Sequence, residues 1–127
     1  MVAFASAAWA NQPIDPVAEA FAAAGGRARI GRTISGGPDG EVRWTAVVAD
    51  GEVSYVSGEV GDADVTFADT LKNAQAQLQG DLSPNAAFMR GQTKVTGPTS
   101  VLLDVLAAAS GPAYDEARQR ASEAAGS

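Results

Sequence analysis

The chain lacks both cysteine and histidine among its 127 residues. Without cysteine there are no disulfides and no thiolate chemistry, and without histidine there is no imidazole base and hardly any route to a zinc or copper site. Catalysis by this chain would have to use carboxylates, hydroxyls or lysine. We therefore expect no metal site.

Basic residues are few: 9 Lys and Arg stand against 15 Asp and Glu, which gives a formal net charge of −6. The field of such a protein repels phosphate backbones, so nucleic acid is not an expected partner. Arg27, Arg29 and Arg32 form the basic cluster of the sequence. We interpret it as the solvated edge of a strand that discourages aggregation, with an anion site as the alternative.

Long apolar runs are also missing. The opening segment MVAFASAAWA contains no basic region and no sustained apolar run, and Asn11, Gln12 and Pro13 follow it directly. A signal peptide needs a basic start before its apolar segment, and a membrane-spanning helix needs about 20 apolar residues. We therefore expect no stable membrane insertion and a cytoplasmic protein.

What the sequence does contain is the composition of an ordinary globular protein, with 46% hydrophobic and 19% charged residues. A chain of this length is close to the commonest size of one domain and can bury one core. It has no internal repeat and no long linker, so we expect a single domain over residues 1–127. Its parts are N-terminal helices over about 1–25, a sheet with helices over 27–109, and a C-terminal helix over about 112–125.

A helix is predicted to begin after Asp15. Asp15 is a suitable N-cap, Pro16 suits the first helical position, and apolar residues recur at helical spacing as far as Ala24. Gly25 and Gly26 then end the helix.

Alternating apolar residues predict four strands in the middle of the chain, read as an antiparallel meander, at 28–34, 42–48, 53–55 and 63–67. Asp50 and Gly51 form a two-residue turn of the kind that joins twisted antiparallel strands. This turn sets Ala46 opposite Tyr55 and brings the apolar faces of the two strands to the same side. Helices are expected to cover that face.

The second half supplies those helices. Phe67, Leu71, Ala74 and Leu78 recur at helical spacing, with Asp69 near the positive end of the helix dipole. The remaining predicted elements are a short helix from 84 to 90, a strand over 92–96, a helix over 98–106 that is apolar round most of its circumference, and a last helix from 112.

Few side chains qualify as catalytic groups. Asp104 lies in the otherwise apolar helix over 98–106, so it either points to water or is buried with a partner. Tyr55 shares the inward face of the sheet, where its hydroxyl needs a hydrogen-bond partner and could hold the polar end of a ligand. If the chain is an enzyme, these two residues are the candidates for acid and base.

The largest apolar collection comprises Trp44, Phe67, Phe88, Met89 and the leucines of the late helix. A packed core is the ordinary reading of such residues. A helix that is apolar nearly all round also suits the wall of a small-molecule pocket, and the two readings look alike in sequence.

Residues 63–106 resemble the conserved half of the sterol carrier protein 2 family, in the same order and nearly without gaps. The segments that carry the resemblance are DVT at 64–66, GDLSP at 80–84, AFMRG at 87–91 and KVTG at 94–97. Phe4, Trp9 and the final helix resemble the small stand-alone bacterial members more loosely. Two positions depart from the family pattern: Gln92 stands in place of a usual lysine and Thr93 in place of a common leucine.

The resemblance implies an α+β fold with a mixed five-stranded sheet, covered on one face by helices and enclosing an apolar cavity. It implies a ligand such as a fatty acid, an acyl chain, a sterol-like molecule or a quinone- or polyketide-like metabolite, and no cofactor. The helix over 101–106 would form one wall, and Phe88 and Met89 would face the interior. The expected ligand-binding residues are Trp44, Tyr55, Phe67, Leu71, Phe88, Met89, Val95, Leu102, Leu103 and Leu106.

The expected function is therefore non-catalytic binding or carriage of a hydrophobic small molecule. Two alternatives stay open. The cavity is recruited for catalysis of a cyclase or dehydratase type, with Tyr55 and Asp104 as the acting groups, or the chain is an accessory or dimerisation subunit that pairs with a second copy or with an enzyme.

Overall fold

The computed structural model describes residues 15–37, 40–57 and 63–124. The part of the expected N-terminal helices that precedes residue 15 lies outside them. The strands are β1 (Ala28–Gly37), β2 (Gly40–Ala49), β3 (Glu52–Ser57), β4 (Val65–Thr70) and β5 (Lys94–Thr96). The helices are α2 (Pro16–Ala23), α3 (Leu71–Gln79), α4 (Pro84–Met89), α5 (Thr99–Ala108) and α6 (Pro112–Ala124).

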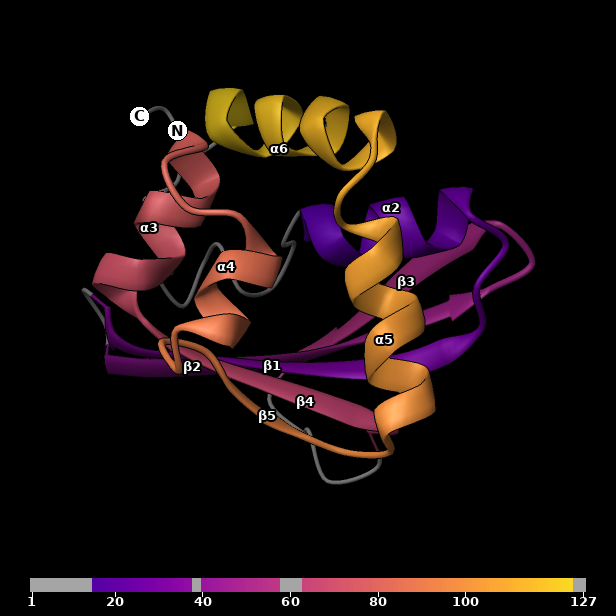
Figure 1. Ribbon diagram of the computed structural model, residues 1–127, viewed down its shortest axis with the longest axis horizontal. Coiled ribbons are helices and arrows are strands. Elements are labelled where there is room, and N and C mark those ends of the chain that lie inside the picture. The colour runs from indigo at the N-terminus through magenta and orange to yellow at the C-terminus, as the bar shows by residue number, and fades with distance from the viewer. Residues whose placement is uncertain (1–14, 38–39, 58–62, 125–127) are drawn as a thin grey trace.

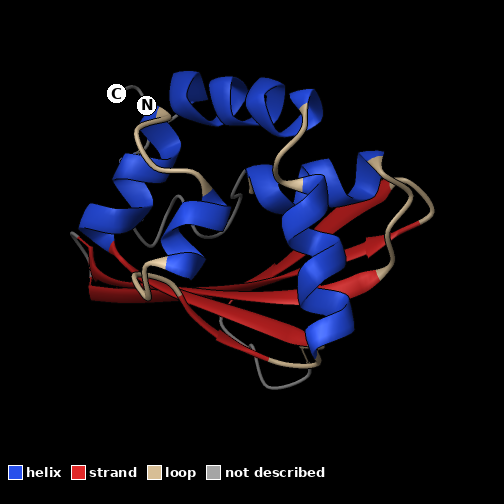
Figure 2. Cartoon of the chain, in the orientation of Figure 1, coloured by secondary structure: helices blue, strands red, loops and turns tan. Residues whose placement is uncertain are grey.

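The five strands form one mixed sheet in the order β3-β2-β1-β4-β5, and the helices lie together on one face of it (Figure 1). Figure 2 shows the two layers as a sheet below and a helical cover above. This architecture is the one that the family resemblance implies. In the part of the chain that the structure describes, no helix is both long and apolar enough to cross a membrane.

The hairpin between β2 and β3 has the predicted geometry. Asp50 and Gly51 both have positive φ, at 55° and 76°, as a two-residue turn between twisted strands requires. The resulting register places Ala46 opposite Tyr55, which confirms the pairing predicted from the turn.

The fourth strand does not continue the meander. β4 pairs in parallel with β1, where Ile30 lies opposite Val65, so the prediction of a simple antiparallel meander is wrong at this strand. Apolar alternation indicates that a segment is a strand, but it does not specify which strand becomes its neighbour. The consequence is that β1 is the central strand, bonded to β2 on one side and β4 on the other.

The boundary between β4 and α3 also differs from the prediction. The helix begins at Leu71, with Thr70 as its N-cap, whose Oγ1 accepts a hydrogen bond from the backbone N–H of Asn73 at 3.3 Å. Phe67 and Asp69 therefore belong to the strand, where they alternate with exposed or half-buried residues and face the helices. Asp69 is not a residue of the helix start but a buried residue at the end of β4.

The structure explains why the KVTG segment ends in glycine at position 97. Its φ is 139°, and a Cβ at this position would lie 2.6 Å from the carbonyl oxygen of Asp64. Only glycine allows the chain to pass this close to the start of β4 before α5 begins.

Candidate functional site

The site is built around a charged residue in the middle of the sheet. Arg32 lies on the central strand β1 in register with Trp44 on β2 and Phe67 on β4, and only 8% of its surface is exposed. Arg27 and Arg29 are exposed, but the interpretation of all three arginines as a solvated edge is wrong for Arg32. The reason is that β1 has neighbours on both sides and Arg32 faces the helices.

Two buried carboxylates flank the guanidinium of Arg32. Nη1 lies 3.6 Å from Asp15 Oδ1 and Nη2 lies 3.8 Å from Asp69 Oδ2, and both aspartate side chains are 1% exposed. The guanidinium also lies over the rings of Trp44 and Phe67, at 6.0 Å and 5.6 Å from their centres. We call Asp15, Arg32 and Asp69 the buried charge cluster.

Asp15 ties this cluster to α2 and to two strands. It is the N-cap of α2, as predicted, and its Oδ1 accepts hydrogen bonds from the N–H groups of Val17 and Ala18 at 3.1 Å and 3.4 Å. Its Oδ2 accepts from Nε1 of Trp44 at 3.2 Å, and its backbone N–H donates to the hydroxyl of Tyr55 at 3.1 Å. One aspartate therefore joins β2, β3 and the start of α2.

Asp69 is held by a residue of α3 and by a residue directly before β5. Its Oδ1 accepts hydrogen bonds from Nε2 of Gln77 on α3 and from the hydroxyl of Thr93. Thr93 and Gln77 are both buried. The replacement of the family's usual leucine by Thr93 thus has a structural reason, because a buried carboxylate needs a donor at that position.

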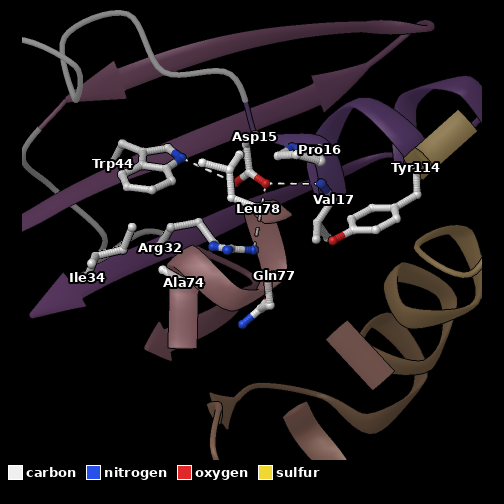
Figure 3. Close-up of a pocket in the computed structure, with 10 residues that line it drawn as sticks. All are labelled: Asp15, Pro16, Val17, Arg32, Ile34, Trp44, Ala74, Gln77, Leu78 and Tyr114. Carbon is white, nitrogen blue, oxygen red and sulfur yellow. Dashed lines mark hydrogen bonds and ion pairs between the residues drawn. The ribbon is translucent and has the colours of Figure 1, made fainter. Parts of the chain in front are cut away.

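Asp15 and Arg32 of this cluster line a small cavity of about 30 Å³ (Figure 3). Figure 3 shows Arg32 reaching from β1 toward Asp15, with Trp44 on one side and Tyr114 of α6 across the pocket. The remaining wall is Pro16, Val17, Ile34, Ala74, Gln77 and Leu78. Ligand pockets measure roughly 300–1,000 Å³. The cavity is therefore too small for a lipid chain, and the charged side chains of Asp15 and Arg32 line it, which differs from the apolar cavity that the resemblance implies.

The electrostatics keep Arg32 charged and the tyrosines neutral. Burial alone would lower the pKa of Arg32, but the facing carboxylates of Asp15 and Asp69 outweigh it, and the pKa is raised. Burial raises the pKa of Tyr114 to about 12, with Arg32 opposing this and Asp15 adding to it. Burial and the charge of Asp15 also raise the pKa of Tyr55.

The cluster leaves hydrogen-bond donors unused. No described residue accepts a hydrogen bond from Arg32 Nε, which is buried. Both ion-pair distances of Arg32 exceed the roughly 2.7–3.2 Å of a direct N–H···O hydrogen bond. Within the described chain, the hydroxyl of Tyr114 also makes no hydrogen bond. Donors therefore remain available at the cavity wall.

The structure brings several of the predicted ligand-binding residues to the interior. Trp44 lines the cavity, Phe67 contacts Arg32, and Tyr55 binds the backbone of Asp15. Leu71 packs against the apolar cluster that contains Trp44. Four more residues belong to the core beneath α2 and α5 or pack against it: Leu102, Leu106, Phe88 and Val95.

Two of the predicted residues do not face the interior. Met89 is 82% exposed and Leu103 is 55% exposed. Ala87 takes the buried position in the short helix α4, so Met89 projects outward. In α5 the buried face is formed by Leu102, Val105 and Leu106, which turns Leu103 to solvent. The prediction that Met89 and Leu103 face the interior is therefore wrong.

Asp104 and Tyr55 are not brought together. Asp104 is exposed and lines a surface hollow beside Phe21 and Arg27, whereas Tyr55 contacts Asp15 on the inner side of the sheet. Of the two readings of Asp104, the structure selects the one in which it points to water. An acid and base pair made of these two residues has no common pocket among the described residues.

Sequence reasoning missed Arg32, Gln77 and Tyr114 as site residues and recognised Asp15 only as a helix cap. One signal was present: Arg32 lies two residues from both Ile30 and Ile34, which share the inward face. A charged residue that shares a strand face with two buried isoleucines is expected to be buried as well, and a buried charge needs partners.

Comparison with known proteins gives consistent results. A family model described as the SCP-2 sterol transfer family matches residues 12–109. A conserved hypothetical protein from Thermus thermophilus is 23% identical with a TM-score of 0.66, over 95% of this chain and 92% of that one. A crystal structure of sterol carrier protein 2 is 24% identical with a TM-score of 0.64, over 91% and 98%.

A third solved structure, palmitated SCP2L2 from Aedes aegypti, is 14% identical with a TM-score of 0.59, over 76% of this chain and 93% of that one. At these identities the structural likeness shows the fold. No curated protein is significantly similar to the chain.

Proposed function

The chain belongs to the SCP-2 sterol transfer family, and from that premise we propose that it binds or carries a hydrophobic small molecule in its interior, between the sheet and the helices. The ligand class is a fatty acid, an acyl chain, a sterol-like molecule or a quinone- or polyketide-like metabolite. The palmitated relative supports an acyl chain as one member of this class. The action is non-catalytic: the protein shields apolar surface from water.

The observation that carries the proposal is the cavity between the sheet and the helices. Its wall combines apolar side chains from α2, α3 and the sheet, among them Val17, Trp44 and Leu78, with donors from Arg32 and Tyr114. Apolar walls with a few convergent polar groups are typical of small-molecule sites.

The cavity must widen to accept a lipid. We infer that α3 and α6 move away from the sheet, because both helices contribute to the wall. Burying a sixteen-carbon chain offers about 0.8 kcal/mol per methylene, or more than about 10 kcal/mol before the losses of association. That gross gain is comparable with the whole stability of a small domain, about 5–15 kcal/mol, so it can offset local opening of the core.

The test is direct detection of a ligand. Native mass spectrometry of the purified chain is expected to show a bound small molecule. At least one of three fluorescent probes, a fatty acid, a sterol and a quinone, is expected to bind at micromolar concentration. A chain that carries nothing and leaves all three probes unbound contradicts the proposal.

Association and location stay predictions. Light scattering will show whether the chain pairs with a second copy, and co-purification will show whether it accompanies an enzyme. Fractionation of the source cells tests the expectation that it is cytoplasmic.

A further inference from the structure

We propose that the buried charge cluster makes this site select ligands whose polar end is an uncharged oxygen, as in an alcohol or a ketone, over ligands that end in a carboxylate. The inference rests on the proposed function, because it concerns the polar end of the ligand that the cavity would take. It adds a chemical criterion that apolar walls by themselves do not supply.

The first step concerns donors. Arg32 is buried, lines the cavity, and has an Nε–H that no described residue accepts. The hydroxyl of Tyr114 lines the same cavity and makes no hydrogen bond within the described chain. The buried Nε–H of Arg32 without a partner costs free energy, and a ligand oxygen that accepts from it would recover that cost, with the Tyr114 hydroxyl as a second donor at the wall. The site therefore favours a hydrogen-bond acceptor.

The second step concerns charge. A guanidinium at a cavity wall normally favours a carboxylate or phosphate. Here Asp15 and Asp69 already face Arg32, so the three side chains together carry one net negative charge in the interior. A ligand carboxylate would add a second uncompensated negative charge, and like charges brought together in a binding site are strongly unfavourable.

The third step concerns the end of α2. A helix N-terminus is the other common source of anion binding, because its free N–H groups and its dipole attract negative charge. The carboxylate of Asp15 already accepts hydrogen bonds from Val17 and Ala18 at this end. Neither the guanidinium nor the helix end is thus left with unbalanced positive charge for a ligand carboxylate.

The experiment compares ligands of equal chain length. Dodecanol and dodecanoate are titrated at neutral pH as competitors of a bound fluorescent lipid probe. The expected result for the unmodified chain is that dodecanol binds at least about tenfold more tightly than dodecanoate. Dodecanoate binding as tightly as dodecanol overturns the inference while leaving the proposed function intact.

A charge-balanced variant sharpens the test. Asp69→Asn removes one negative charge, and its side-chain oxygen can still accept from Gln77 and Thr93. We expect this variant to lose most of the preference for dodecanol, because Arg32 then has one carboxylate partner. Asp81→Asn is the matched control, since Asp81 is exposed and its loss changes the net charge equally. An unchanged preference in Asp69→Asn, or an equal change in Asp81→Asn, contradicts the inference.

A further variant tests the hydroxyl of Tyr114. Tyr114→Phe keeps the ring and removes the hydroxyl, and it is expected to weaken dodecanol binding about fivefold. The comparison in the unmodified chain decides the outcome by itself if Asp69→Asn fails to fold. If neither ligand nor any probe binds the unmodified chain, the proposed function fails and this inference falls with it.

Discussion

The hydroxyl of Thr93 donates a hydrogen bond to the buried carboxylate of Asp69, 24 residues earlier in the chain. A position where the family commonly has leucine is therefore coupled to a charge at the end of β4. The coupling explains how a threonine fits at this position of the fold: the interior here is partly polar, and the hydroxyl has a buried acceptor.

Replacing Thr93 by valine will destabilise the fold. The side chain keeps its shape but no longer donates to Asp69, and loss of a donor to a buried charged acceptor costs about 1–3 kcal/mol. Urea unfolding will measure the change in the free energy of unfolding. Thr96→Val, at an exposed position three residues later, is the control and should lie within about 0.5 kcal/mol of the unmodified chain. Equal effects of the two substitutions would contradict the role assigned to Thr93.

Replacing Arg32 by methionine will have a larger effect. It leaves Asp15 and Asp69 buried without a cation, a situation that costs about 3–5 kcal/mol. Arg29→Met on the same strand removes an exposed charge and should change stability by less than about 0.5 kcal/mol. The two variants are compared by chemical unfolding. Adding Asp15→Asn and Asp69→Asn to Arg32→Met should restore part of the loss, and no restoration would show that charge burial is not the cause.

The two tyrosines predict an alkaline loss of stability. Tyr55 and Tyr114 are the only tyrosines of the chain, and burial raises both pKa values, that of Tyr114 to about 12. Each therefore holds its proton more tightly in the folded than in the unfolded state. Their contribution is fully present below the ordinary pKa of about 10 and is lost as the pH rises from there through the folded value. Stability should fall over that range.

The measurement is the ultraviolet absorbance of tyrosinate during a pH titration. In urea both tyrosines should ionise near a pH of about 10, whereas in the folded chain ionisation should be delayed and should coincide with unfolding. Tyr114→Phe should reduce the alkaline fall in stability. Ionisation of the folded chain at the ordinary pH would contradict the burial of the two hydroxyls.

Filling the cavity tests where the ligand binds. Ala74 on α3 is buried and lines the cavity, and Ala74→Leu adds apolar volume there at a cost of about 1–3 kcal/mol in stability. We expect probe affinity to fall at least about tenfold. Ala23→Leu on the exposed side of α2 is the matched control, with affinity unchanged. Full binding by a folded Ala74→Leu variant would place the ligand elsewhere.

Two adjacent leucines of α5 test the orientation of that helix. Leu102 is 8% exposed and belongs to the core, whereas Leu103 is 55% exposed. Leu102→Ala should cost about 2–5 kcal/mol, and Leu103→Ala should change stability by less than about 0.5 kcal/mol. Thermal unfolding of the two variants side by side gives the comparison. A large loss in Leu103→Ala would contradict the outward position of that side chain.

Local patterns predicted much of the fold because they depend on neighbours in the chain. Asp15 before Pro16 predicts the start of α2, and Asp50 with Gly51 predicts the hairpin and its register. The family segments predict the mixed sheet and the helical cover. The parallel pairing of β4 with β1 could not be predicted from the alternation of apolar residues. Alternation indicates that a segment is a strand and which face is buried, but it does not indicate which strand lies beside it.

The order of the residues is enough to predict the class of this protein: the chain has no cysteine or histidine for thiolate or imidazole chemistry, and four family segments indicate the fold. The contents of the interior follow from packing instead. Arg32 becomes a buried charge because β1 is central, and Asp15 and Asp69 become its partners because α2 and β4 converge on that strand. The charge balance of a site depends on residues far apart in sequence, and their meeting is a property of the packed chain alone.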